Sequence, residues 1–234
     1  MSGGVLFKRV TRNERGRDLL VGDVHGYFTK LQRALDAVGF EPAAGDRLFS
    51  VGDLVDRGPE SGQVLQWLAE PWFHAVQGNH EAWAMAYHRG AASPRVYAAN
   101  GGAWFMEMSS AQRQAYVDAF EALPLAIELD TPDGLLGIVH ADLPLSHWHA
   151  LEPALQMASS SLTHGALVDS MQWGRDRAEG LLCGEVADVR AVVVGHTPMK
   201  HVTSFDNVLF IDTGAWLPRG GEFVLIDAET LVAA

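Results

Sequence analysis

The chain has 234 residues, of which 48% are hydrophobic and 20% are charged, which predicts one large domain with a substantial core. Its formal net charge of −12 argues against nucleic acid and anionic membrane surfaces as partners, because both bind clustered Lys and Arg. A single cysteine, Cys183, and an N-terminus without an apolar signal segment favour a cytoplasmic protein.

Short apolar runs that end in glycine or beside it predict buried strands in the first half of the chain. These runs cover residues 18–22, 47–52 and 73–78. The segments between them space their apolar residues as helices do, and Val64, Leu65 and Leu68 suggest a helix that leads into the third strand. The chain is therefore expected to alternate strands and helices, with right-handed crossovers between parallel strands.

Two helices have recognisable ends. The helix between the first two strands would place four apolar side chains on one face, namely Phe28, Leu31, Leu35 and Val38. Gly39 is expected to end this helix. A later helix, over about 110–122, would begin with a capping box formed by Ser109 and Gln112 and end before Pro124.

The second half of the chain favours strands over helices. Turn residues at 132–134 and 206–207 lie between apolar runs and predict two hairpins, and further buried strands are expected at 135–140 and 191–196. Residues 144–180 lack a clear period and are expected to form loop and short helix. The predicted fold class is α/β (α+β), with a two-sheet core and helices outside.

Polar residues follow five of the predicted strands at the point where each strand ends. The motifs "GDVHG", "GDLVDRG" and "GNHE" follow the first three strands, and a single histidine follows each of two later ones. The carboxyl ends of parallel strands lie at one edge of a sheet, so these side chains can converge. The resulting donor set is Asp23, His25, Asp53, Asn79, His140 and His196.

This donor set indicates metal binding. Oxygen and imidazole donors without a thiolate suit Mn²⁺, Fe or Zn²⁺ better than Ca²⁺ or Mg²⁺. Six donors are too many for one catalytic ion with an open position, and they match two ions that share a carboxylate. Each motif alone has a local explanation, such as a helix cap or an Asp–Arg turn, but their joint occurrence at successive strand ends favours the metal site.

Together, these motifs resemble the three signature motifs of the phosphoprotein phosphatase family of metallophosphoesterases. The segments "IVHAD" and "VVGHTP" resemble that family's two later histidine blocks, and the likeness runs from residue 19 to about 214. It favours the bacterial and phage branch. It implies a calcineurin-like β-sandwich of two sheets flanked by helices, in one catalytic domain over residues 1–234 with its core at about 18–228.

The resemblance also implies how the metal ions are held. Asp23 and His25 would bind the first ion, Asn79, His140 and His196 the second, and Asp53 would bridge them. Both ions are expected to be Mn²⁺, with Fe or Zn²⁺ as alternatives. A hydroxide shared by the two ions would attack the phosphorus directly, without a covalent phospho-enzyme.

Further residues are implied to act on the substrate. His80 would be the general acid and Asp56 would orient its ring, because a carboxylate on one ring nitrogen fixes the tautomer and supports the protonated form. Arg57 would bind two phosphate oxygens at once. The second arginine that the family uses is expected to be Arg175 of "QWGRDR", with the nearby Arg177 as the alternative.

Three positions bear on the substrate class. The family's symmetrical dinucleoside polyphosphate hydrolases tend to carry "ARG", "GNHD" and "HAG", whereas this chain has Asp56, Glu81 and Asp142 at those points. We therefore predict a serine/threonine protein phosphatase, with tyrosine phosphate as a further candidate and a phosphoprotein or small phosphoester as substrate. The alternatives are a diadenosine tetraphosphate hydrolase and a metal-binding module without turnover. Glu81 and Asp142 are expected to support ligands rather than bind metal.

Overall fold

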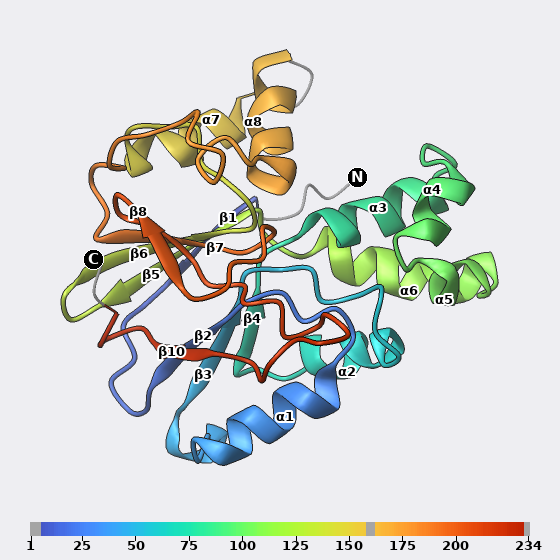
Figure 1. Ribbon diagram of the computed structural model, residues 1–234, viewed down its shortest axis with the longest axis horizontal. Helices are drawn as coiled ribbons and strands as arrows, with labels where there is room; N and C mark the ends of the chain where they lie inside the picture. Colours follow the sequence, from blue (N-terminus) through green and yellow to red (C-terminus); the bar gives the residue numbers. More distant parts are fainter. Residues whose placement is uncertain (1–5, 158–161, 232–234) are drawn as a thin grey trace.

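The computed structural model describes residues 6–157 and 162–231. Two β-sheets packed face to face form the middle of the molecule (Figure 1). Within the described ranges, the larger sheet has six strands in the order β1 (Phe7–Val10), β5 (Ala126–Thr131), β6 (Gly134–Val139), β7 (Ala191–Val194), β9 (Val208–Phe210) and β8 (Thr203–Phe205). The smaller sheet has four, in the order β10 (Leu225–Asp227), β2 (Asp18–Val21), β3 (Arg47–Ser50) and β4 (Phe73–Ala75).

The smaller sheet confirms the strands predicted in the first half of the chain. β2, β3 and β4 are parallel neighbours, as alternation with helices requires. Each strand is shorter than predicted and ends at Val21, Ser50 or Ala75. The chain leaves the sheet one to three residues early because the residues that follow turn into the loops that carry the site.

The larger sheet confirms both predicted hairpins. β5 pairs with β6 and β8 with β9, each in antiparallel register, while β6, β7 and β9 are parallel. Two strands, β1 and β10, were not predicted. Both are only partly buried, because each lies at the edge of a sheet and pairs on one side only.

Alternation of side chains along the strands makes three apolar layers. Leu20 of β2 and Ile138 of β6 point between the two sheets, where they share one buried cluster. Their neighbours Leu19 and Val21 point outward against the helices of the smaller sheet. On the larger sheet, Val139 points outward into a third cluster with other helices. The order of layers is therefore helix, sheet, sheet, helix, as expected.

Helices cover both outer faces (Figure 1). Those packed with the smaller sheet are α1 (Phe28–Ala37), α2 (Val64–Leu68), α3 (Asn79–His88), α4 (Pro94–Ala99), α5 (Ala103–Met106) and α6 (Ser110–Glu121). Those on the larger sheet are α7 (Leu151–Gln156) and α8 (Leu162–Trp173). No helix in the described parts of the chain has the length and apolar content needed to cross a membrane.

Helix ends were predicted better than helix faces. The capping box of Ser109 and Gln112 starts α6, and Gly39 follows α1 with a φ of +62°. Val38, predicted on the buried face of α1, lies beyond its end and is 44% exposed. The expectation of only short helices in 144–180 is also wrong, since α8 has 12 residues. Its apolar residues are spread around the helix and show no period, and residues 158–161 lie outside the described ranges.

Candidate metal centre

The six predicted metal ligands come together at the carboxyl ends of five strands. The loops after β2, β3 and β4 of the smaller sheet meet the loops after β6 and β7 of the larger one. Each of the six side chains is at most 8% exposed. The site therefore lies across both sheets, rather than along the edge of one sheet as the sequence pattern alone suggests.

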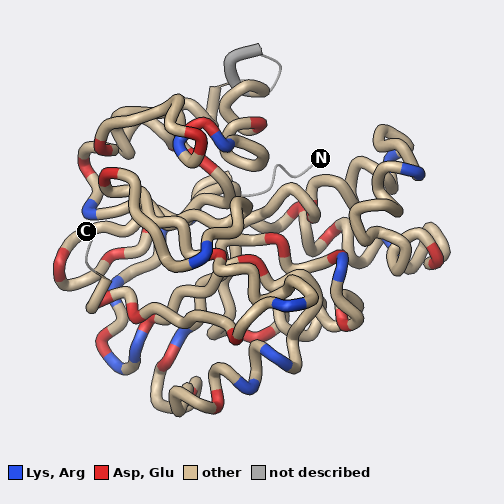
Figure 2. The backbone as a smooth tube through the Cα atoms, in the orientation of Figure 1, with Lys and Arg blue, Asp and Glu red and all other residues tan. Residues whose placement is uncertain are grey.

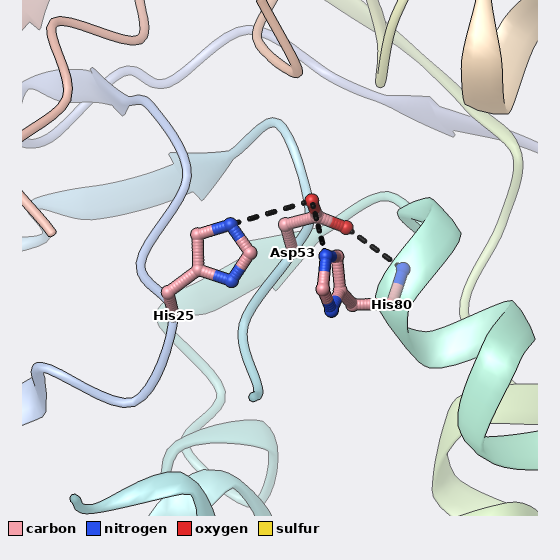
Figure 3. A group of neighbouring side chains, drawn as sticks. All are labelled: His25, Asp53 and His80. Atoms are coloured by element: carbon pink, nitrogen blue, oxygen red, sulfur yellow. Dashed lines mark hydrogen bonds and ion pairs between the residues drawn. The ribbon is translucent and has the colours of Figure 1, made fainter. Parts of the chain in front are cut away.

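The carboxylate of Asp53 lies in the middle of this cluster (Figure 3). Its Oδ2 atom is 3.5 Å from His25 Nε2, and its Oδ1 atom is 3.4 Å from His140 Nε2. The two oxygens thus face different imidazoles on opposite sides. A carboxylate that bridges two metal ions needs this arrangement.

The remaining donors divide between these two sides. On one side, Asp23 Oδ2 lies 3.9 Å from His25 Nε2. On the other, Asn79 Oδ1 lies 2.8 Å from His140 Nε2 and 2.9 Å from His196 Nδ1. The grouping is the one that the family resemblance implies, and the roles of the six residues as ligands stay a prediction.

Backbone carbonyls orient two of the histidines. Val55 O accepts from His25 Nδ1 at 2.9 Å, and Val51 O accepts from His140 Nδ1 at 2.7 Å. The Nε2 atoms of the two rings then face the centre of the cluster, at 3.5 Å and 3.4 Å from the carboxylate of Asp53. Histidines that bind metals usually donate their other ring nitrogen to such a partner.

The loops hold these side chains against local backbone preference. Among the described residues, seven other than glycine have a positive φ, and five of them are candidate site residues, namely His25, Asp53, Asp56, Arg57 and His196. Strain of this kind persists where the surrounding structure fixes it, and it is frequent at functional sites. Space is equally restricted, because a Cβ at Gly78 or Gly195 would lie 2.3 or 2.2 Å from a carboxylate oxygen of Asp53 or Asp23.

Buried acidic side chains are concentrated here. Several acidic positions lie near the middle of the molecule, with others spread over the rest of the chain (Figure 2). Burial, Asp212 and Asp53 together raise the pKa of Asp23 well above its usual value. Burial also acts to raise the pKa of Asp53, but the fields of His140 and His80 hold it well below the usual range. A buried carboxylate with a raised pKa lacks a compensating cation, so the donor set fits divalent metal ions.

His80 is placed beside the cluster and paired with Asp56, as predicted from the resemblance. Its Nδ1 atom donates to Asp56 Oδ2 at 2.7 Å. The other ring nitrogen, Nε2, is buried and lies 3.9 Å from Asp53 Oδ2, and no hydrogen-bond partner for it exists among the described residues. Nε2 is therefore free to give or take a proton at the centre of the site.

The arginines differ sharply in their surroundings. Arg57 is exposed, with Nη1 2.9 Å from His25 Nε2 and its guanidinium 4.2 Å from the ring centre of Trp216. Arg175 is also exposed and donates from Nη1 to the hydroxyl of Thr197, next to His196. Arg57 and Arg175 can therefore reach a bound anion.

Arg177 lies inside the protein. Its side chain is 2% exposed and forms ion pairs with Asp142 Oδ1 at 3.7 Å and Asp206 Oδ2 at 3.2 Å. This pairing leaves Arg175 as the better candidate for the second phosphate-binding arginine.

Glu81 and Asp142 hold loops of the site. Glu81 accepts hydrogen bonds from the backbone N–H groups of Asp53, Leu54 and Gly78. Asp142 accepts from the backbone N–H groups of Leu143 and Arg177. Both are buried, and through these bonds they fix the loops that carry the candidate ligands and Arg175.

Four residues at the site were not predicted from the sequence, namely Tyr97, Trp104, Asp212 and Trp216. Asp212 follows β9 at its carboxyl end and accepts from Trp216 Nε1 at 3.2 Å. The segment "IDTG" repeats the strand, acid and glycine pattern of the other motifs, so Asp212 could have been found from the sequence. Tyr97 and Trp104 donate to Asp56, and no sequence signal points to that contact.

Comparison with known proteins gives consistent matches over most of the chain. A family model for calcineurin-like phosphoesterases matches residues 17–200. Serine/threonine-protein phosphatase 2 of Escherichia coli K12 is 36% identical over 209 residues, which cover 86% of this chain and 88% of that protein. Serine/threonine-protein phosphatase 1 of Salmonella typhimurium LT2 is 33% identical over 223 residues, covering 94% and 95% of the two chains.

Other matches are partial in sequence or limited to the fold. A symmetrical bis(5'-nucleosyl)-tetraphosphatase of Paracidovorax citrulli is 33% identical over 66% of this chain and 51% of its own length. The structure of a serine/threonine phosphatase from Saccharomyces cerevisiae aligns with a TM-score of 0.56 at 15% identity, covering 98% of this chain and 85% of the other. This last likeness concerns the fold, and it confirms the predicted two-sheet architecture.

Proposed function

The chain belongs to the calcineurin-like phosphoesterase family of metal-dependent hydrolases, and from this premise we propose that it is a two-metal phosphatase of serine/threonine phosphoproteins. The observation that carries the proposal is the carboxylate of Asp53, whose two oxygens face two separate donor groups. His80, paired with Asp56, lies at its side. The two ion positions and the proton donor are then adjacent, as hydrolysis of a phosphoester requires.

In this proposal, Asp23 and His25 would hold one ion, Asn79, His140 and His196 would hold the other, and Asp53 would be shared between them. Three oxygen and three imidazole donors suit Mn²⁺, which we propose as the metal, with Fe or Zn²⁺ as alternatives. When bound, two such ions activate water as the nucleophile and offset negative charge on the phosphoryl oxygens. The protein's contribution is to keep the donors rigid and buried.

His80 supplies the proton for the leaving group. As the P–O bond to the leaving oxygen breaks, that oxygen takes a proton from Nε2, while Nδ1 remains bonded to Asp56. The contact with Asp56 holds the ring with Nε2 turned towards Asp53. The backbone N–H of His80 donates to Asp53 Oδ1 at 3.0 Å, which fixes the position of His80 relative to the carboxylate of Asp53.

Arg57 and Arg175 bind the phosphate. A guanidinium can donate to two phosphate oxygens at once, and its charge stabilises the trigonal transition state in which negative charge spreads over those oxygens. Trp216 supports the guanidinium of Arg57 from one face, which limits the positions that this flexible side chain adopts.

The Asp56–His80 contact also favours a phosphoprotein over a dinucleotide substrate. Asp56 stands where the family's dinucleoside polyphosphate hydrolases tend to carry alanine, and a protein alcohol is a poor leaving group that needs a proton. The two relatives with the broadest coverage described above are named serine/threonine phosphatases, which agrees with this choice. We further propose that the protein acts in the cytoplasm.

Substrate preference tests the proposal. After removal of metal and reconstitution with Mn²⁺, we expect phosphate release from p-nitrophenyl phosphate and from phosphoserine and phosphothreonine peptides. Peptide turnover should exceed cleavage of diadenosine tetraphosphate at equal concentration. The metal-free protein and protein reloaded with Fe or Zn²⁺ are the controls for metal identity.

Preferential cleavage of the dinucleotide would overturn the phosphoprotein assignment and establish the alternative hydrolase. Faster hydrolysis of phosphotyrosine than of phosphoserine peptides would move the preference within the phosphoprotein class. Absence of turnover with every metal, in protein that binds two ions, would favour the module without turnover.

The Arg175→Ala substitution is expected to lower kcat/KM by about 10–100-fold without changing the metal content or the melting temperature. The lost interaction is a charge-assisted hydrogen bond to a phosphate oxygen. Arg12→Ala is a matched control. Arg12 is an exposed arginine paired with Asp130, which lies near the end of β5 that points away from the site.

Arg177→Ala should instead destabilise the fold by about 3–5 kcal/mol, since it leaves Asp142 buried and unpaired. Thermal unfolding and steady-state kinetics of the three variants separate these effects. A loss of kcat/KM in Arg177→Ala at full stability, with Arg175→Ala unchanged, would reverse the assignment.

A further inference from the structure

The carboxylate of Asp56 is bonded on both of its oxygens. Oδ2 accepts from His80 Nδ1, whereas Oδ1 accepts from Trp104 Nε1 at 2.7 Å and from the hydroxyl of Tyr97 at 3.2 Å. The side chain of Asp56 is fully buried. A buried carboxylate needs hydrogen-bond donors for its lone pairs, and these three side chains supply them.

The two aromatic donors come from a separate part of the fold. Tyr97 lies on α4 and Trp104 on α5, in a helical segment between α3 and α6 that supplies none of the candidate ligands. Both rings pack around Phe105, with ring centres 6.3 and 5.5 Å from it. Tyr97 is completely buried, so the surrounding side chains hold its ring in place with the hydroxyl against Asp56.

The turn between these helices also presses on the loop that carries Asp56. Gly101 has a φ of +99°, and a Cβ there would lie 2.2 Å from the backbone nitrogen of Arg57. At Gly102 a Cβ would fall 2.3 Å from the ring of Tyr97. The backbone of this turn is thus in direct contact with the loop, and only glycine allows the approach.

The loop requires such support because its conformation is strained. Asp56 and Arg57 have φ values of +68° and +66°, which residues with side chains adopt only at a cost in free energy. Without donors on Oδ1, the carboxylate could rotate about its χ2 angle and turn away from the ring of His80. Burial, followed by the charge of Asp56, raises the pKa of Tyr97 well above its usual value, so its hydroxyl keeps the proton that it donates.

We infer that Tyr97 and Trp104 are positioning residues of the reaction, which hold Asp56 and, through it, fix the ring of His80 so that Nε2 faces the leaving oxygen. This inference rests on the proposed role of His80 as the proton donor. It extends the functional site from the strand ends to α4 and α5, which contribute no metal ligand and no phosphate contact.

The dependence of rate on the leaving group tests this inference. Phenyl phosphate needs a proton on its leaving oxygen, whereas 2,4-dinitrophenyl phosphate releases a stable anion without one. In the Mn²⁺-loaded protein, Tyr97→Phe and Trp104→Phe should each lower kcat for phenyl phosphate about 3–10-fold. The kcat for the dinitrophenyl ester should stay within about twofold of the wild-type value.

Tyr87→Phe is the matched control. The ring of Tyr87 packs 5.3 Å from that of Tyr97, while the described donors to the Asp56 side chain are His80, Tyr97 and Trp104. The control also removes a tyrosine hydroxyl from this aromatic cluster, but one that is not among the described donors to Asp56. It should leave the ratio of the two kcat values unchanged. Tyr97→Phe conserves the ring, so the test stands even if Trp104→Phe lowers the yield of folded protein.

The outcomes distinguish this inference from the proposed function. Equal losses on both esters, or a fall in melting temperature with an unchanged ratio, would overturn the positioning role, provided that His80→Ala lowers the ratio. An unchanged ratio in His80→Ala would remove the proton donor and this inference with it. A wild-type protein that hydrolyses neither ester with any metal would refute the proposed function itself.

Discussion

Replacing Asp53 with Asn is expected to lower the affinity for both metal ions by more than about 100-fold and to abolish measurable phosphatase activity. Changes to groups that only support a ligand cost 10–100-fold in metal affinity, and loss of a shared ligand should cost more. Asparagine keeps the size of the side chain but removes its charge and one of the two oxygens that face His25 and His140. Both ion positions are therefore affected by one substitution.

Metal content after dialysis, measured by atomic emission, checks this prediction directly. Asp133→Asn provides a matched control, because Asp133 is a surface carboxylate whose side chain is 68% exposed. The control should bind two ions and show wild-type turnover. Retention of two tightly bound ions by Asp53→Asn would contradict the bridging role.

The second large effect is expected for His80→Ala, which should lower kcat about 10²–10⁴-fold on substrates with poor leaving groups. Metal content should be unchanged. The bond from His80 to Asp53 Oδ1 comes from the backbone N–H, so it survives removal of the imidazole. The variant thus removes the proton donor while leaving the bridging carboxylate in place.

His88→Ala, on the same helix α3, is the control for loss of an imidazole. His88 lies at the far end of this helix and contacts Gln114. It should have wild-type kcat and metal content. Loss of metal from His80→Ala would show that His80 is a metal ligand, and would contradict its role as the proton donor.

Much of the fold follows from local patterns. The strands β2, β3, β4, β6 and β7 are short apolar runs followed by turn residues, and such runs reveal a buried strand wherever it lies in the sheet. Edge strands β1 and β10 and helix α8 escape this reasoning. The side chains of β1 and β10 are only partly buried, and the apolar residues of α8 do not follow a helical period, so burial leaves no clear pattern in these segments.

The identity of the candidate ligands was also predictable from the sequence. Asp23, Asp53 and His140 each come shortly after a mainly apolar strand, and the recurrence of this pattern at several strand ends is what singles them out. The chemistry of the side chains then restricts the class of metal. Asp212 comes after β9 in the same way and was not predicted.

Contacts between distant segments could not be predicted in the same way. The sequence around Arg175 and Arg177 does not show which of the two side chains is buried. In the structure, Arg177 pairs with Asp142 inside the protein, whereas Arg175 is exposed beside Thr197. Trp104 reaches Asp56 across 48 positions of the chain. Neither contact has a local cause.

The sequence by itself determined most of the strands, the candidate donor residues at their ends and the expectation of metal binding, because apolar period, turn residues and ligand type are properties of neighbouring residues. Only the tertiary structure decided that the site lies across both sheets, that the two oxygens of Asp53 face different imidazoles, and that α4 and α5 hold Asp56. These features depend on how two sheets and their helices pack. Packing brings together residues whose separation along the chain carries no information about their distance in space.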